Sequence, residues 1–198
     1  MILYRSLTPI LKIFGIYFLV SNCIEMLSLS LAENNISNLF LFHVNTLIEF
    51  WFLIIFFHAS DKKYGKKFPL GFVLSIGVIM IMVNTLFIQK LDTFNSYSAT
   101  LVNIVLLISS FRFFFNTMDA EITDELKTLK VVVSCLLLVF GTSLIVLLFS
   151  NAMLDIATTY QLYIWDFRGI LILVTKVIIG FLFANLLYLS RNKLMSHE

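Results

Sequence analysis

The sequence predicts an all-α fold, a six-span transmembrane helical bundle with both termini in the cytoplasm. Hydrophobic residues make up 60% of the 198 residues and charged residues 13%, against roughly half and a quarter in a soluble domain. Six apolar stretches are each close to the roughly 20 residues that a membrane-spanning helix needs. Lysine and arginine also gather in alternate connections between these stretches.

The six apolar stretches are continuous rather than alternating, which favours helices over the strands of a membrane barrel. Pro9 and Pro69, the two prolines of the chain, each lie at the start of a span, where a missing N–H is tolerated. Residues 1–198 are therefore predicted to form a single transmembrane domain. We expect the spans at about residues 10–31, 39–58, 68–88, 96–115, 131–150 and 167–190.

The distribution of lysine and arginine predicts the orientation. Eleven of them lie near the N-terminus, at the connections after the second and fourth spans, and in the C-terminal tail, whereas the alternate connections hold only Lys90 and Arg168. Cytoplasmic loops carry an excess of these residues. We therefore expect 59–67, 116–130 and 191–198 in the cytoplasm, and 32–38, 89–95 and 151–166 outside.

The connection after the second span is the most basic part of the chain. Its sequence, DKKYGKKF, places four lysines beside the membrane, where they suit contact with anionic lipid headgroups. The lipid bilayer is thus the main expected partner, and no nucleic-acid partner is expected. The four residues are Lys62, Lys63, Lys66 and Lys67.

Two longer segments separate other spans. Residues 116–130 carry four acids before two lysines, which predicts a polar cytoplasmic helix whose early acids suit the helix dipole. A docking surface for a cytosolic protein is the alternative. In residues 151–166, Tyr160, Tyr163 and Trp165 fit an interfacial aromatic belt, and a lid over an outer pocket is the alternative.

Polar side chains within the spans are the candidate functional residues, because ionisable groups in a membrane are costly and usually face a bundle interior. Helical rise places Glu49 and Lys176 within about 4 Å of the midplane. Five further side chains lie on its outer side, so a shared polar interior that opens outward is expected. Lys176 should pair with Glu49 or Glu25, and we expect Glu49 and Lys176 to approach each other across the second and sixth spans. The full set is Glu25, His43, Asn45, Glu49, Asn84, Asn103 and Lys176.

Two interpretations of this polar layer stay open. It is either a structural ion pair with interhelical hydrogen bonds, or a ligand, ion or proton site. No catalytic activity is expected, because the sequence lacks HExxH, GxSxG, paired intramembrane aspartates and a glycine-rich phosphate loop. No metal is expected, because His43 and Glu49 are six residues apart on different helix faces.

Residues 34–57, NNISNLFLFHVNTLIEFWFLIIFF, resemble the N-x-x-x-H/Y…EF pattern of small uncharacterised integral membrane proteins of Bacteroidota-type bacteria, through His43, Glu49 and Phe50. The resemblance implies a bacterial inner membrane but no activity; those proteins often have a further span before this point. Lys176, in LVTKVIIGF, resembles the retinal-attachment lysine of microbial rhodopsins. Six spans instead of seven and the missing acid-rich third helix lead us to expect no retinal and no other cofactor.

Two functional classes follow from the sequence. The first is a small sensory or accessory membrane module that binds a ligand or partner through an outward-opening polar interior. The second is a transporter or channel subunit that uses Glu25, Glu49 and Lys176 as a charge relay. The small size and the absence of similarity between the two three-span halves favour the first class.

Overall fold

The computed structural model describes residues 7–64, 67, 69–148 and 158–195, and its secondary structure within them is helical. Six helical segments of this part are long and apolar enough to cross a membrane, which confirms the predicted all-α, six-span bundle. The protein is a multi-pass membrane protein. Its helices are α1 (Pro9–Glu33), α2 (Leu39–Lys63), α3 (Leu70–Val83) continued by the π-helical turn η2 (Asn84–Ile88), α4 (Ser96–Asn116), α5 (Asp124–Leu148) and α7 (Thr158–Met195).

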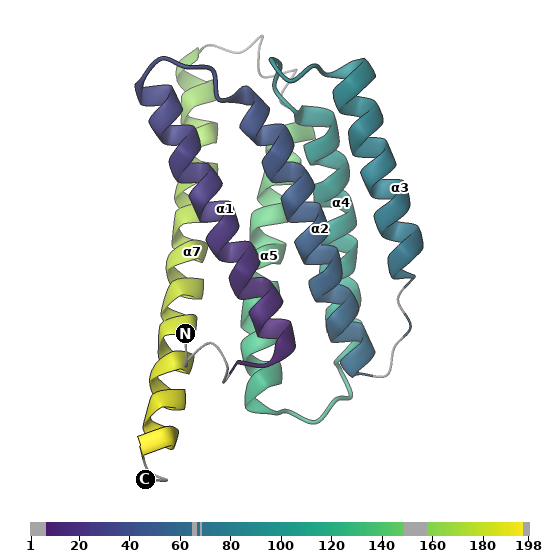
Figure 1. The fold of residues 1–198 in the computed structure, drawn as a ribbon, viewed down its shortest axis with the longest axis vertical. Helices are drawn as coiled ribbons and strands as arrows, with labels where there is room; N and C mark the ends of the chain where they lie inside the picture. The colour runs from purple at the N-terminus through teal and green to yellow at the C-terminus, as the bar shows by residue number, and fades with distance from the viewer. Residues whose placement is uncertain (1–6, 65–66, 68, 149–157, 196–198) are drawn as a thin grey trace.

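The helices alternate in direction, so α1 begins and α7 ends at the same end of the bundle (Figure 1). That end also carries the connections from α2 to α3 and from α4 to α5. We call it the basic end, because it holds Lys62, Lys63 and Lys67. The opposite end carries loops 34–38 and 89–95. α2 packs between α1 and α4, α5 packs between α4 and α7, and α3 lies at the edge against α2 (Figure 1).

Aromatic and aliphatic side chains fill the half of the bundle nearer the basic end. Phe14 of α1 packs against Phe56 of α2 and Phe183 of α7, with ring centroids 5.5 and 6.1 Å apart. Buried side chains of α2, α4 and α5 surround them, so this half is a dense apolar core. They include Phe50, Leu53, Ile54, Phe57, Leu106, Phe113, Leu129 and Val132.

One helix contact depends on a glycine. Phe50 of α2 is fully buried, and its ring lies directly over Gly77 of α3. A Cβ added at Gly77 would overlap that ring. The missing side chain therefore lets α3 approach α2 closely, as small residues do at helix interfaces in membranes.

The helices differ from the predicted spans at several places, and α2 and α7 continue to Lys63 and Met195, beyond the predicted 58 and 190. α5 begins at Asp124, so the polar helix predicted before the fifth span is present from that residue, whereas 117–123 are not helical. Residues 158–166, predicted as outer loop, are the first turns of α7, because TTYQLYIWD holds no proline or glycine to stop a helix. The π-helical turn Asn84–Ile88 ends the third span, and hydrophobic periodicity does not predict it.

Part of the predicted outer segment, 151–157, lies outside the described residues, so a lid formed by it stays a prediction. Of the three aromatic residues proposed for an interfacial belt, Tyr163 is exposed on α7. The side chains of Tyr160 and Trp165 lie outside the described ones.

Candidate functional site

A cavity of about 690 Å³ lies among α1, α2, α4, α5 and α7. Its volume falls within the range of about 300–1,000 Å³ typical of small-molecule sites. Asn38 and Asn95, from the loops opposite the basic end, line the cavity at that end, whereas Phe14 and Phe140 line it nearer the apolar core. The cavity therefore occupies the half of the bundle that the apolar core leaves open.

The cavity has a polar wall and an apolar wall. Residues spaced by three or four positions share one face of a helix, and this spacing aligns the polar residues of α1 and of α2. The polar wall consists of Tyr17, Ser21, Asn22, Glu25, Ser28, Asn45, Thr46 and Glu49. On the apolar wall, α5 contributes Leu136, Val139, Phe140 and Leu147, together with Ser143.

Four of the residues that line the cavity carry charged side chains, two acidic and two basic. Glu25 and Glu49 come from α1 and α2, and both bases, Arg168 and Lys176, come from α7. Lys176 Nζ forms an ion pair with Glu25 Oε2. Glu49 Oε1 accepts a hydrogen bond of 2.9 Å from the Tyr17 hydroxyl, and it lies within electrostatic range of both bases. Opposite charges compensate one another here, as a medium of low dielectric requires.

Arg168 and Tyr17 were not among the predicted site residues. Arg168 was counted with the connection before the last span, but α7 begins earlier than predicted, and Arg168 donates from Nε to Ser143 Oγ over 3.0 Å. Tyr17 precedes Ser21 and Glu25 by four and eight residues. That spacing could have placed its hydroxyl on the polar face of α1.

Five of the predicted site residues line the cavity: Glu25, Asn45, Glu49, Asn103 and Lys176. The predicted partner of Lys176 was Glu49 or Glu25, and its direct contact is with Glu25, while its charge reaches Glu49 over a longer range.

Asn45 and Asn103, the two predicted asparagines that line the cavity, differ in the hydrogen bonds of their side-chain amides. The Asn103 amide donates to the Ala99 carbonyl over 2.7 Å within its own helix. Asn45 Oδ1 is buried and, within the described part of the chain, has no donor. Buried acceptors are normally satisfied, so Asn45 is a candidate ligand contact.

The other two predicted residues, His43 and Asn84, do not line the cavity; they lie between α2 and η2. His43 Nε2 lies 3.1 Å from the Thr93 carbonyl, which can only accept, so Nε2 carries the hydrogen. In the neutral ring, Nδ1 then accepts from the Thr85 hydroxyl over 3.2 Å. These bonds attach α2 to η2 and to loop 89–95.

Asn84 belongs to a polar network that reaches the lining of the cavity. Its Nδ2 donates to Ser98 Oγ over 2.7 Å and lies 3.4 Å from Asn95 Oδ1. Asn95 Nδ2 in turn donates to Thr46 Oγ1 over 3.1 Å. Because Thr46 and Asn95 both line the cavity, this network holds loop 89–95 against the cavity lining.

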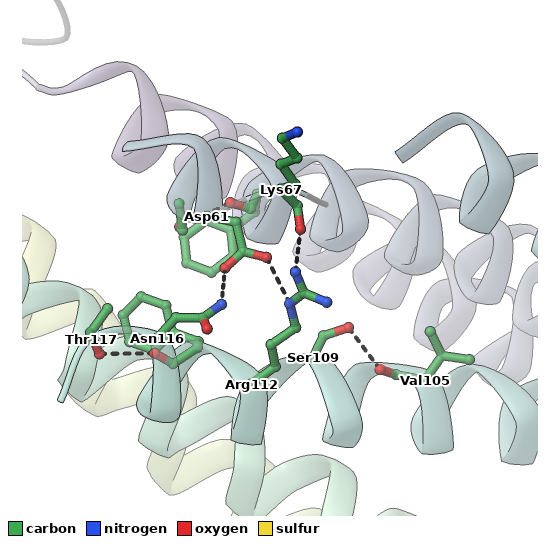
Figure 2. Close-up of polar contacts among 10 residues, drawn as sticks. Asp61, Lys67, Val105, Ser109, Arg112, Asn116 and Thr117 are labelled. Atoms are coloured by element: carbon green, nitrogen blue, oxygen red, sulfur yellow. Dashed lines mark hydrogen bonds and ion pairs between the residues drawn. The ribbon is translucent and has the colours of Figure 1, made fainter. Parts of the chain in front are cut away.

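A separate polar cluster joins α2 to α4 at the basic end (Figure 2). The side chain of Asp61 is only 5% exposed. It accepts hydrogen bonds from Arg112 Nε at 3.0 Å and from Asn116 Nδ2 at 2.7 Å. Arg112 also donates to the Lys67 carbonyl. A buried carboxylate needs such partners, so the cluster serves to hold the α2–α3 connection against α4.

Next to this cluster, Lys63 forms an ion pair with Glu125. Burial, together with the charge of Glu125, raises the pKa of Tyr64. One of the four lysines predicted to face anionic lipid thus contacts the 116–130 segment of the same chain.

Searches of protein-family models, curated proteins and solved structures find no match to this chain. Among the described residues, no group of three or more His, Cys, Asp or Glu side chains could hold a metal ion. The cavity and its charges are therefore the features from which a function can be inferred.

Proposed function

We propose that the protein is a small binding module of the membrane, of the sensory or accessory kind, which takes a small polar ligand into its cavity from outside. The observation that supports this function is a cavity of about 690 Å³ lined by two acids and two bases. Ionisable residues within membrane spans commonly mark the sites of ligands, ions or protons. The proposal includes no catalytic step.

A transporter or channel subunit is the second candidate, supported by Glu49 and Lys176 within the spans. A charge relay needs polar groups along a continuous path. Toward the basic end, the cavity meets Phe14 and Phe140, and Phe56 packs against Phe14; all three rings are at most 1% exposed. Among the described residues, these buried rings lie between the charges and the basic end, and this packing suits binding better than relay.

The outward orientation rests on the positive charges. We propose that the basic end lies in the cytoplasm, because cytoplasmic loops carry an excess of lysine and arginine, and that the cavity opens outward. The resemblance of residues 34–57 to small bacterial membrane proteins is the reason to propose a bacterial inner membrane. Lys62 and Lys67 are exposed at the basic end and are proposed to face anionic lipid, and segment 116–130 is proposed to meet a cytosolic partner.

Access from one side distinguishes binding from relay. Ser21 lines the cavity near the middle of α1. With Cys23 and Cys135 replaced by alanine, we expect Ser21→Cys to react with a membrane-impermeant thiol reagent from outside intact cells. The same variant should stay unreacted when the reagent is added to inverted vesicles, because the aromatic core closes the inner side.

The matched control is a protein that keeps Cys23 and has Ser21 intact. Cys23 is exposed on α1 but does not line the cavity, so lipid surrounds its thiol and a water-soluble reagent should not reach it. Reaction of Ser21→Cys from both sides would contradict the binding module and support the charge relay of a transporter or channel. If Ser21→Cys does not react from outside, the proposed binding function is wrong.

A further inference from the structure

The charges of the cavity are separated by sign. Both acids, Glu25 and Glu49, belong to the wall formed by α1 and α2, whereas both bases, Arg168 and Lys176, belong to α7. A molecule between these walls meets carboxylates on one side and cationic groups on the other. The arrangement suits a ligand that carries a positive group and a negative group at its two ends.

The balance of charge restricts the net charge of that ligand. Two acids and two bases give the cavity lining no net formal charge. A cationic or anionic ligand would add an uncompensated charge in surroundings of low dielectric, which is costly. A zwitterion adds no net charge, and each of its ends can meet a residue of opposite sign.

The apolar wall of the cavity, formed by α5, also restricts the ligand. α5 contributes Leu136, Val139, Phe140 and Leu147, and a ligand that covers them with an apolar group removes their surface from water. From Phe14 to Leu29, the part of α1 that lines the cavity is about 20 Å long. Such a cavity can hold a molecule larger than a single small ion.

Building on the proposed function, we propose that the ligand is a zwitterion with an apolar side group, of the class of apolar amino acids and short apolar peptides. Its ammonium group lies at the wall that carries Glu25 and Glu49, and its carboxylate lies at Arg168 and Lys176. The apolar group rests on α5. Exchange of the Lys176–Glu25 ion pair for contacts to the ligand accompanies binding.

Four commercial peptides test this assignment by protecting Ser21→Cys from the thiol reagent. Leucyl-leucine is a zwitterion, leucyl-leucinamide is a cation, N-acetyl-leucyl-leucine is an anion, and glycyl-glycine is a zwitterion without an apolar group. At ten times its Kd, leucyl-leucine should slow labelling about tenfold. Each of the other three should need at least about a tenfold higher concentration for the same protection.

Charge variants of the lining separate recognition from mere filling of the cavity. Glu49→Gln leaves an excess of positive charge, so protection should shift toward the N-acetyl peptide. Lys176→Gln leaves an excess of negative charge, so protection should shift toward the amide. A residue that only stabilised the fold would not produce opposite shifts. Labelling of each variant without peptide confirms that its cavity is still open.

The outcomes distinguish the two proposals. Ser21→Cys that is not labelled in the absence of peptide contradicts the proposed function itself. Normal labelling without protection by leucyl-leucine overturns the zwitterion and leaves the cavity as a site for another ligand. Equal protection by leucyl-leucine and by the amide, the N-acetyl peptide or glycyl-glycine also overturns it, as does a common direction of shift in the two charge variants.

Discussion

Gly77→Ala is expected to destabilise the bundle by about 1–3 kcal/mol, the range for overpacked interiors. Alanine normally favours a helix over glycine by up to about 1 kcal/mol, so the expected sign is opposite to the helical preference. The reason is the ring of Phe50, which an added Cβ would overlap and which is fully buried and has no room to move. Reversible unfolding in detergent measures the change.

Gly71→Ala is the matched control, because Gly71 lies on the same helix with nothing within 4 Å of an added Cβ. It should be neutral or slightly stabilising. Phe50→Leu should return part of the stability that Gly77→Ala removes, because it takes away the overlapping ring atoms. Equal effects of the two alanine variants would contradict the close packing of α3 on α2.

Lys176→Met is expected to lower the free energy of unfolding by about 1–3 kcal/mol, because it leaves the Glu25 carboxylate without its partner inside a membrane span. The range is set below that of a fully buried pair, since the Glu25 side chain is 52% exposed. Unfolding of purified protein in the same detergent gives the value.

A double-mutant cycle tells which acid is the partner of Lys176. Glu25→Gln combined with Lys176→Met should recover a substantial part of the loss, because no unpaired charge remains at the contact. Glu49→Gln combined with Lys176→Met should recover less, because Tyr17 is the direct partner of Glu49. Strictly additive effects at Glu25, or a larger recovery at Glu49, would count against the pairing.

The fold was predictable because the physics of a bilayer restricts it strongly. A continuous apolar run in a bilayer must form a helix, because its backbone groups need hydrogen-bond partners within the segment. The thickness of the bilayer then sets the length of that helix. Helix ends were less predictable where the flanking residues are themselves good helix formers, as in 158–166. The close contact of Gly77 with Phe50 joins two helices, and no pattern within either helix indicates it.

The site was predictable as a set of residues but not as a set of contacts. Hydropathy finds Glu25, Glu49 and Lys176 because charge in an apolar run is rare. Which helix faces meet depends on packing, so the sequence left both acids open as partners of Lys176. Depth alone also grouped His43 with the cavity, although the face of α2 on which it lies contacts η2 and loop 89–95.

A spin label at position 21, compared with one at Cys23, tests most directly whether the charged residues surround a water-accessible cavity. The two positions lie two residues apart on α1, and Ser21 lines the cavity whereas Cys23 does not. In protein reconstituted into nanodiscs, a water-soluble nickel complex should relax the label at position 21 more strongly than oxygen does. At Cys23 oxygen should dominate, because it partitions into lipid. Dominance of oxygen at both positions would contradict a polar cavity and leave only a structural ion pair.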